Sequence, residues 1–227
     1  MATGSGVSSH ARSRSELTRQ REVFKYASSM LTNIAVHEDG IPQTVEQRIA
    51  SENTTLTAFA QLCACQTGMS RSIISLFDEK YQYVVAEATP SLPLVPNTPH
   101  EDLWLCGHAF PRRNGICEYT LFEADKIRET CTDNPAEPPV ITIPDLTTDA
   151  RFKSKAYAIG NPEQPSRFYA SAPIRTPKGV SIGAISVMHP EPMANWSQVE
   201  IQVLRNISRA IMSYLEGNRT TAYFRSE

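Results

Sequence analysis

The segment 167–192, RFYASAPIRTPKGVSIGAISVMHPEP, limits what the chain can fold into more than any other stretch. Small and apolar residues at every second position fall on one strand face, which leaves Arg167, Tyr169 and Ser171 on the other. The triplet 177–179, Pro-Lys-Gly, supplies a turn because proline fixes φ and glycine tolerates a positive φ. The chain then returns through a second apolar strand, so the segment predicts one antiparallel β-hairpin.

Hydrophobic periodicity places the other elements. In chain order the sequence predicts a helix from Ser13, a loop over 32–53, a helix over 53–68, strands over 72–77 and 82–88, a loop over 89–115, a short helix over 116–122, an insertion over 124–138, a strand over 140–145, a turn at 149–152 into a small helix, the hairpin, and a last helix over 197–217. This order predicts an α+β fold. Its antiparallel central sheet carries the terminal helices on one face and loops plus short helices on the other.

The same pattern divides the chain into four parts. They are a disordered tail over 1–12, an N-terminal helix and loop over 13–53, one domain over 54–217 and a C-terminal tail over 218–227. The single domain is long enough to bury a core of ordinary size.

Capping residues mark the helix ends. Asn53 is the expected N-cap of a helix that stops at Gly68, whereas Ser13 and Ser197 each open a capping box with a glutamate three residues later. Inside the hairpin, Gly183 indicates close approach of a neighbouring backbone. The last helix has the strongest apolar stripe, made of Ile201, Leu204, Ile207, Ile211 and Leu215.

Composition argues against several classes of partner. Of 227 residues, 41% are hydrophobic and 20% charged, and the formal net charge of −2 gives no reason to expect nucleic-acid binding. No apolar run approaches the roughly 20 residues needed to cross a bilayer, and the N-terminus lacks the apolar stretch of a secretory signal. The five cysteines, an odd number, favour reduced thiols over a disulfide framework. We therefore expect a cytoplasmic protein without a membrane or nucleic-acid partner.

Short motifs spread over residues 54–216 carry a resemblance to a known family. They are 58–62 (AFAQL), 75–78 (SLFD), 81–89 (YQYVVAEAT), 115–118 (GICE), 144–146 (PDL), 149–152 (DARF) and 167–170 (RFYA). Together they resemble a GAF domain, most of all the N-terminal GAF sensor modules of fungal hybrid histidine kinases. The resemblance implies a small-molecule pocket between the sheet and the middle loops, and terminal helices that carry a signal and often dimerise.

By their positions in this family, five residues are expected around the pocket: Trp104 as a lid residue, Cys117, Phe152, Arg167 and Tyr169. The identity of the ligand is left open, and no metal or cofactor is expected. An apolar seam on the first helix predicts a homodimer; it consists of the heptad-spaced residues Leu17, Phe24 and Leu31.

Arg167 has two possible roles. It shares a hairpin face with Tyr169, and a guanidinium beside a phenol could hold a carboxylate or a phosphate. Alternatively, Arg167 pairs with a structural acid, such as Asp145 or Asp149, and pins a loop to the sheet.

Cys106 and Cys117 raise the question of thiol chemistry. One branch of the GAF family, the free methionine sulfoxide reductases, uses paired cysteines in this middle region and another further on. The later region 151–169 contains no cysteine, which favours a small buried thiol at Cys117. Cys106 beside Gly107 and His108 resembles only weakly the Cys-His pair of bilin-binding phytochrome domains. The spacing of cysteines and histidines predicts no zinc site.

The leading hypothesis is a GAF-type sensory or regulatory module that binds a small molecule and lacks its own kinase domain. No Gly-rich phosphate loop, Ser-His-Asp order or kinase ATP lid appears in the sequence. The alternative is a GAF-fold enzyme acting on a small metabolite, for example in a fungal biosynthetic pathway or in thiol-dependent methionine sulfoxide reduction. Such an enzyme would use Tyr169, Arg167, Glu118, His108 or a thiol. A third reading is a scaffold that dimerises through its helices and binds nothing small.

Overall fold

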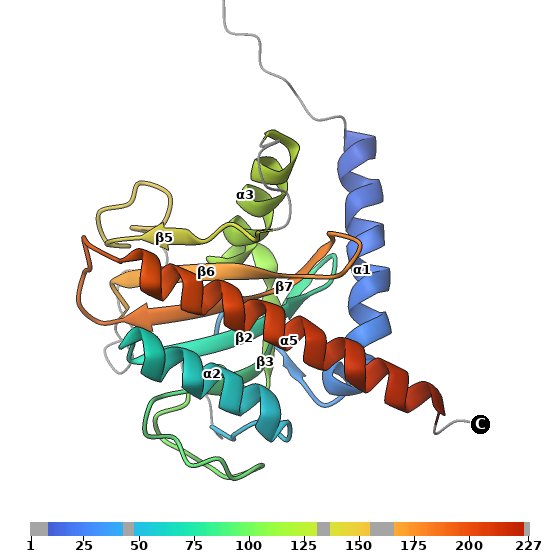
Figure 1. Cartoon of the computed structure of the whole chain (residues 1–227), viewed down its shortest axis with the longest axis horizontal. Helices are drawn as coiled ribbons and strands as arrows, with labels where there is room; N and C mark the ends of the chain where they lie inside the picture. The colour runs from blue at the N-terminus through green and yellow to red at the C-terminus, as the bar shows by residue number, and fades with distance from the viewer. Residues whose placement is uncertain (1–8, 43–47, 131–136, 155–165, 225–227) are drawn as a thin grey trace, which may run out of the picture.

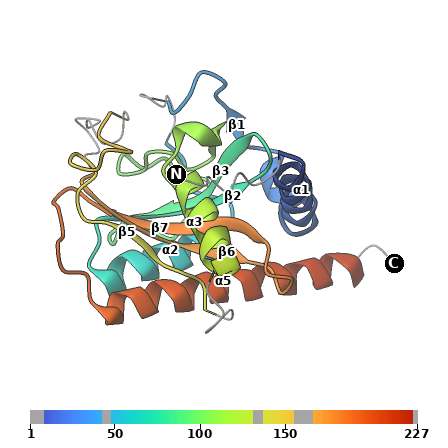
Figure 2. The same cartoon turned by 90° about the horizontal axis from the view of Figure 1, so that it is seen from above.

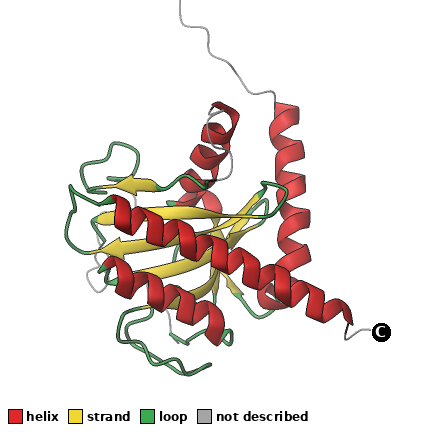
Figure 3. Cartoon of the chain, in the orientation of Figure 1, coloured by secondary structure: helices red, strands yellow, loops and turns green. Residues whose placement is uncertain are grey.

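A seven-stranded sheet forms the centre of the protein, whose computed structural model describes residues 9–42, 48–130, 137–154 and 166–224 (Figure 3). The strands are β1 (Ala35–Val36), β2 (Arg71–Phe77), β3 (Tyr81–Ala88), β4 (His108–Pro111), β5 (Ile141–Ile143), β6 (Phe168–Arg175) and β7 (Ser181–His189). They lie in the order β1-β4-β3-β2-β7-β6-β5. All neighbours pair antiparallel except β1 and β4, which are parallel.

Helices cover both faces of this sheet (Figure 1). They are α1 (Ser9–Leu31), α2 (Thr54–Thr67), α3 (Cys117–Thr130) and α5 (Gln198–Phe224), with a 3₁₀ turn, η1, over Arg112–Asn114. α2 and α5 lie side by side on one face, and α3 packs on β6 and β7 from the other. α1 contacts α5, β7 and β2 on the side of the molecule opposite β5 (Figure 2). The predicted α+β arrangement is confirmed. No described helix is both long and apolar enough to span a membrane.

The predicted hairpin is confirmed as β6 and β7, which pair antiparallel along their length. Gly179 adopts φ +77° in the connecting turn. At Gly183, a Cβ atom would lie 2.4 Å from the carbonyl oxygen of Ser75. β7 can therefore approach β2 this closely only because residue 183 has no side chain.

Two of the predicted helix caps are also confirmed. Asn53 Oδ1 accepts a hydrogen bond from the N–H of Leu56 at 3.0 Å, and Gly68 ends α2 with φ +67°. At the start of α5, the N–H of Ser197 donates to the Glu200 carboxylate at 3.1 Å, as a capping box requires. The side chains thus satisfy donors that the first helical turn leaves without partners.

Two helix ends differ from the prediction. α1 begins at Ser9 rather than Ser13, and the expected capping glutamate, Glu16, instead pairs with Arg19 and Arg112. α5 continues through Gly217 to the end of its range. A glycine inside a helix costs only about 1 kcal/mol relative to alanine, so it does not stop a helix that is packed along its length.

Three predicted connections contain regular structure. β1 lies within the predicted loop 32–53, and both β4 and η1 lie within the predicted loop 89–115. α3 extends from the predicted short helix into the predicted insertion, as far as Thr130. The small helix expected after the turn at 149–152 falls outside the described residues. These elements are short or polar, and local hydrophobic periodicity does not reveal them.

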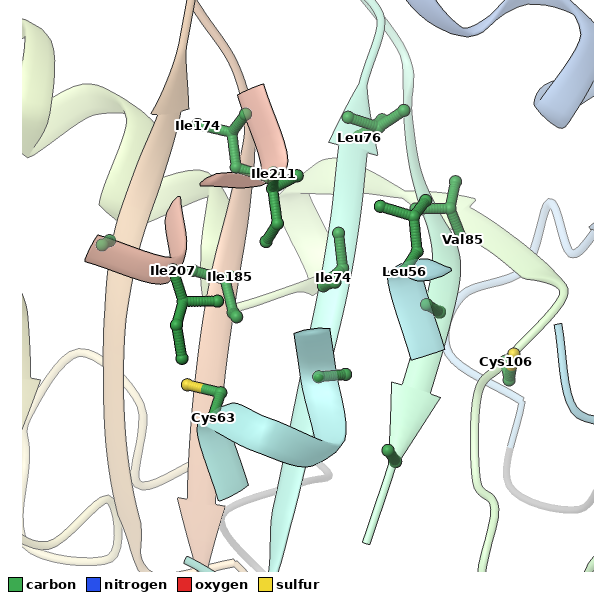
Figure 4. Close-up of a cluster of buried hydrophobic side chains, with 14 of the residues drawn as sticks. Leu56, Cys63, Ile74, Leu76, Val85, Cys106, Ile174, Ile185, Ile207 and Ile211 are labelled. Atoms are coloured by element: carbon green, nitrogen blue, oxygen red, sulfur yellow. The ribbon is translucent and has the colours of Figure 1, made fainter. Parts of the chain in front are cut away.

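The sheet separates two hydrophobic clusters. The helix-side cluster packs α2 and α5 on one sheet face and includes Leu56, Ile74, Ile185, Ile207 and Ile211 (Figure 4). The α3-side cluster lies on the opposite face and includes Phe77, Phe110, Leu121, Tyr169 and Met188. The two faces therefore have separate interiors.

We expect Ile211→Ala and Ile207→Ala each to lower the free energy of unfolding by about 2–5 kcal/mol, because each truncation leaves a cavity in a packed core. Ile211 is 0% exposed and Ile207 is 5% exposed. Val199→Ala on the same helix is the matched control: Val199 is 71% exposed, so its truncation should change stability by no more than about 0.5 kcal/mol. Urea denaturation measures all three, and equal effects would show that α5 does not seal the core.

Candidate functional site

A cluster of polar side chains is buried between the sheet and α3. Cys117 and Thr120 come from the first turns of α3, Tyr169 and Ser171 from β6, and Ser186 from β7. Ser171 and Ser186 are directly opposite each other in the β6–β7 ladder, so their side chains share a sheet face. All five are almost completely inaccessible to solvent. We call these residues the polar cluster.

Hydrogen bonds join its members into a network. The Tyr169 hydroxyl donates to Cys117 Sγ at 3.2 Å. The Thr120 hydroxyl lies 3.2 Å from that of Tyr169 and 2.5 Å from that of Ser171. Ser186 donates to the carbonyl of Ile73 at 3.3 Å. None of the five side chains forming the cluster carries a formal charge, so the cluster presents neutral donors and acceptors.

Burial controls the ionisation of these groups. It raises the pKa of the Cys117 thiol, and it raises the pKa of the Tyr169 hydroxyl well above its usual value. Burial also raises the pKa of Cys63 and of Cys106 to about 12. A thiolate is the nucleophilic form of cysteine, so none of these thiols is activated for attack.

Of the five predicted site residues, the structure brings Cys117 and Tyr169 into contact and places Trp104 and Phe152 in the same α3-side cluster. Phe152 packs edge-on against Tyr119, with ring centroids 5.6 Å apart. Trp104 is 5% exposed, and its indole Nε1 is buried without a hydrogen-bond partner among the described residues. A buried polar atom of this kind is uncommon and requires an explanation.

Arg167 does not join the other four. Its guanidinium pairs with Asp145, with Nε 3.3 Å from Oδ1, and its side chain is 42% exposed. The hydrogen bond from Arg167 lowers the pKa of Asp145 to about 2. This pair joins the loop after β5 to the start of β6. Of the two roles that the sequence left open for Arg167, anion binding and a structural ion pair, this arrangement is the ion pair.

Cys106 and Cys117 are not brought together. Cys106 belongs to the helix-side cluster, at the margin beyond Val85, whereas Cys117 belongs to the α3-side cluster (Figure 4). The four cysteines of the described residues are free thiols. The arrangement therefore does not favour the redox pair that the sequence left open.

Glu87 was not recognised from the sequence as a functional residue. This β3 carboxylate is 0% exposed and accepts hydrogen bonds from the backbone N–H groups of Trp104, Leu105 and Cys106, at 2.9, 2.7 and 2.9 Å. It also pairs with Arg71, at the start of β2. The signal that could have identified it is an acidic residue inside an otherwise apolar strand, because buried carboxylates are almost always paired.

Arg112 was also not recognised. Its buried guanidinium donates to Glu16 of α1 at 2.6 Å, to Glu118 of α3 at 3.0 Å and to the carbonyl of Asp78 at 2.9 Å. These bonds join α1, α3 and the β2–β3 turn at one point. Its signal in the sequence is weak, because the double arginine at 112–113 resembles an ordinary solvated loop.

A pocket of about 1060 Å³ opens at a different place, beside α1, β1, β3 and the N-terminal end of α2. His37 and His108 line it, with Nε2 and Nδ1 2.8 Å apart, and Cys106 lies in its wall. We call this space the helix-side pocket. Within the described parts of the chain, no three His, Cys, Asp or Glu side chains are grouped as metal ligands.

Comparison with known proteins gives one sequence relative. No model of a protein family matches the chain. Over 156 residues the chain is 26% identical to a cyclic di-GMP phosphodiesterase of Pseudomonas aeruginosa, and the match covers 64% of this chain and 24% of the phosphodiesterase. The chain therefore spans about a quarter of the length of this curated relative.

Solved structures give a likeness over most of the chain. The GAF domain of an Acinetobacter phosphoenolpyruvate-protein phosphotransferase has a TM-score of 0.52 at 14% identity, covering 90% of this chain and 94% of that domain. A GAF domain from Synechocystis, solved in its photoproduct state, has a TM-score of 0.49 at 12% identity, covering 77% of this chain and 99% of that one. A relation to fungal hybrid histidine kinases stays a prediction. The seven-stranded sheet and its helices have the fold of a GAF domain.

Proposed function

We propose that the chain is a sensory or regulatory module of the GAF type, located in the cytoplasm, that binds a small molecule and acts without catalysis of its own. The fold supports this proposal, as does the relative, in which the matched segment is about a quarter of a much longer phosphodiesterase. A segment of that size fits a regulatory part that accompanies another activity. Free thiols in the described structure fit a reducing compartment.

The observation that carries the proposal is the contrast between the two sheet faces. The helix side of β6 and β7 is apolar, whereas the other side holds the hydroxyls and the thiol of the polar cluster. Two further buried atoms near this face, Trp104 Nε1 and Gln82 Oε1, have no hydrogen-bond partner in the described structure. Unsatisfied buried polar atoms cost about 1–3 kcal/mol each, and a bound molecule would recover that energy.

The proposed ligand is small, polar and uncharged. Cys117 and Tyr169 would hydrogen-bond to it, while Trp104 and Phe152 would enclose its apolar edges. Charged ligands are disfavoured because no charged side chain belongs to the polar cluster. We assign Arg167 to pinning the loop rather than to the ligand, because its guanidinium already pairs with Asp145 at the surface.

Native mass spectrometry of the full chain purified from its own source tests the proposal. We expect an additional small mass on the wild-type protein, retained in Arg167→Ala and lost in Thr120→Val and Tyr169→Phe. Each of the last two removes one hydroxyl from the polar cluster with little change in volume. Melting temperatures show whether the variants remain folded. An adduct that persists in both hydroxyl variants, or a wild-type protein without any adduct, would overturn the assignment.

The reactivity of the cysteines distinguishes this proposal from the alternative of a thiol-dependent enzyme. We expect Cys65 alone to react rapidly with 5,5′-dithiobis(2-nitrobenzoate) in a folded Cys131→Ser variant, because Cys65 is exposed. Cys63, Cys106 and Cys117 should react slowly, since burial raises the pKa of each and so depletes its thiolate. Cys65→Ser is the control and should remove the fast phase. A Cys106–Cys117 disulfide formed under mild oxidation would instead favour the enzyme.

We further propose that the chain self-associates through α1. Leu17 and Phe24 lie on this helix at heptad spacing and are 47% and 44% exposed, whereas Leu31, the third residue of the predicted seam, packs against the helix-side cluster. On the adjoining face of the helix, Val23 and Ala27 are buried against the core. The exposed pair therefore remains available for a second copy of the chain.

Light scattering at tens of micromolar should give the mass of a dimer for the wild-type protein and of a monomer for the double variant Leu17→Lys/Phe24→Lys. The variant places charge in the proposed seam, where it would be desolvated. Thr18→Lys/Ser29→Lys adds the same charge to exposed positions at the side of the seam and should remain dimeric. A monomeric wild-type protein would show that the exposed pair is not an interface.

A further inference from the structure

The helix-side pocket is a second cavity of the described structure, and nothing in the proposed function uses it. Its volume of about 1060 Å³ matches the upper end of ligand sites, which run from roughly 300 to 1,000 Å³. Its wall includes Val85 and Cys106 of the helix-side cluster. None of the five residues of the polar cluster lines this pocket, so the two places are distinct.

The lining of this pocket combines apolar side chains with polar ones. Met30, Ile34 and Val85 supply apolar surface from α1, the segment before β1, and β3. Hydroxyl and amide groups from several elements complete the wall. Among the described lining residues, the exposed Glu52 is the one carboxylate, and none is a lysine or an arginine. A lining with a carboxylate and no lysine or arginine disfavours phosphate, sulfonate or carboxylate groups.

His37 and His108 add hydrogen-bonding capacity without requiring charge. A contact of 2.8 Å between two ring nitrogens needs one ring to donate and the other to accept. The ring that accepts has a free lone pair and is therefore uncharged in this arrangement. The pair thus supplies a hydrogen-bonding point beside the apolar surface of Met30, Ile34 and Val85, and such a point can fix the orientation of a ligand.

The pocket also lies where three helices meet. Asn53, the N-cap of α2, accepts a hydrogen bond from the Tyr214 hydroxyl of α5 at 3.0 Å, and its amide lies 3.6 Å from the sulfur of Met30 in α1. All three residues line the pocket. A molecule bound there would contact α1 and α5, the two terminal helices of the described chain, at the same time.

From this geometry we propose that the helix-side pocket is a second binding site, which takes a small, uncharged organic molecule with an apolar part and a group that hydrogen-bonds to the His37–His108 pair. The carboxylate of Glu52, in a lining without lysine or arginine, disfavours anionic ligands, phosphorylated nucleotides among them. The site does not depend on a ligand in the polar cluster, and its contacts with α1 and α5 make it a point at which a small molecule can alter the terminal helices.

A pair of fluorescent probes tests this charge preference on the full chain. N-phenyl-1-naphthylamine is uncharged, and 8-anilinonaphthalene-1-sulfonate is nearly the same molecule with one sulfonate. At about pH 8 we expect the uncharged probe to bind at least about ten-fold more tightly than the sulfonate. Equal affinity, tighter binding of the sulfonate, or no binding of the uncharged probe would overturn the proposal.

Cavity-filling variants locate the bound probe. Ala35→Trp and Ser29→Trp place an indole in the pocket from β1 and from α1, and each should weaken binding of the uncharged probe at least about ten-fold. Val36→Trp is the matched control, because Val36 is the next residue of β1, is 49% exposed and does not line the pocket. Unchanged binding in both filling variants, with melting temperatures near that of the wild-type protein, would place the probe elsewhere and refute the site.

Thr120→Val separates this inference from the proposed function. It alters the polar cluster beneath α3 and leaves the helix-side pocket intact, so affinity for the uncharged probe should stay within about two-fold. A ten-fold loss in Thr120→Val would mean that the probe occupies the polar cluster, and the second site would be withdrawn.

Discussion

The buried carboxylate of Glu87 is the interaction on which both sites depend. A charge in the interior is tolerated only when it is paired and hydrogen-bonded, and here Arg71 and three consecutive backbone N–H groups compensate it. Because these groups converge on one side chain, the backbone of 104–106 has little freedom. Trp104 is thereby held in the α3-side cluster, while Cys106 enters the wall of the helix-side pocket. One strand residue thus positions groups on both faces of the sheet.

Local sequence patterns were sufficient to predict the elements that contain their own turn, cap or periodicity signals. The β6–β7 hairpin has alternation and a Pro-Lys-Gly turn, α2 has its cap at Asn53, and α5 has an apolar stripe with a capping box. β1 and β4 have no such local pattern. β1 is two residues long and exists because it pairs in parallel with a strand more than 70 positions away in the chain. Tertiary contacts, rather than propensity, decide strands of this kind.

The candidate site was predicted in part for the same reason. Cys117 and Tyr169 belong to motifs whose positions in the fold are fixed by α3 and β6, and they do meet. Arg167 was placed by alternation alone. Alternation does not show where a strand begins, and Arg167 lies just before the first residue of β6, where its guanidinium reaches Asp145 instead of the polar cluster. The helix-side pocket was not foreseen, because its wall comes from several separate segments and no single stretch of sequence shows a pattern.

Arg112 has a consequence for how parts of this protein can move. A guanidinium is a rigid planar fork, so its donors cannot be redirected independently of one another. Its partners sit on α1, on α3 and in the β2–β3 turn. If α3 lifts away from the sheet, either the bond to Glu118 breaks or Arg112 follows and pulls Glu16 with it. α1 and α3 pack on different parts of the sheet, yet both are bonded to the same guanidinium. Arg112 therefore couples the two helices mechanically, so that a displacement of one strains the bonds that hold the other.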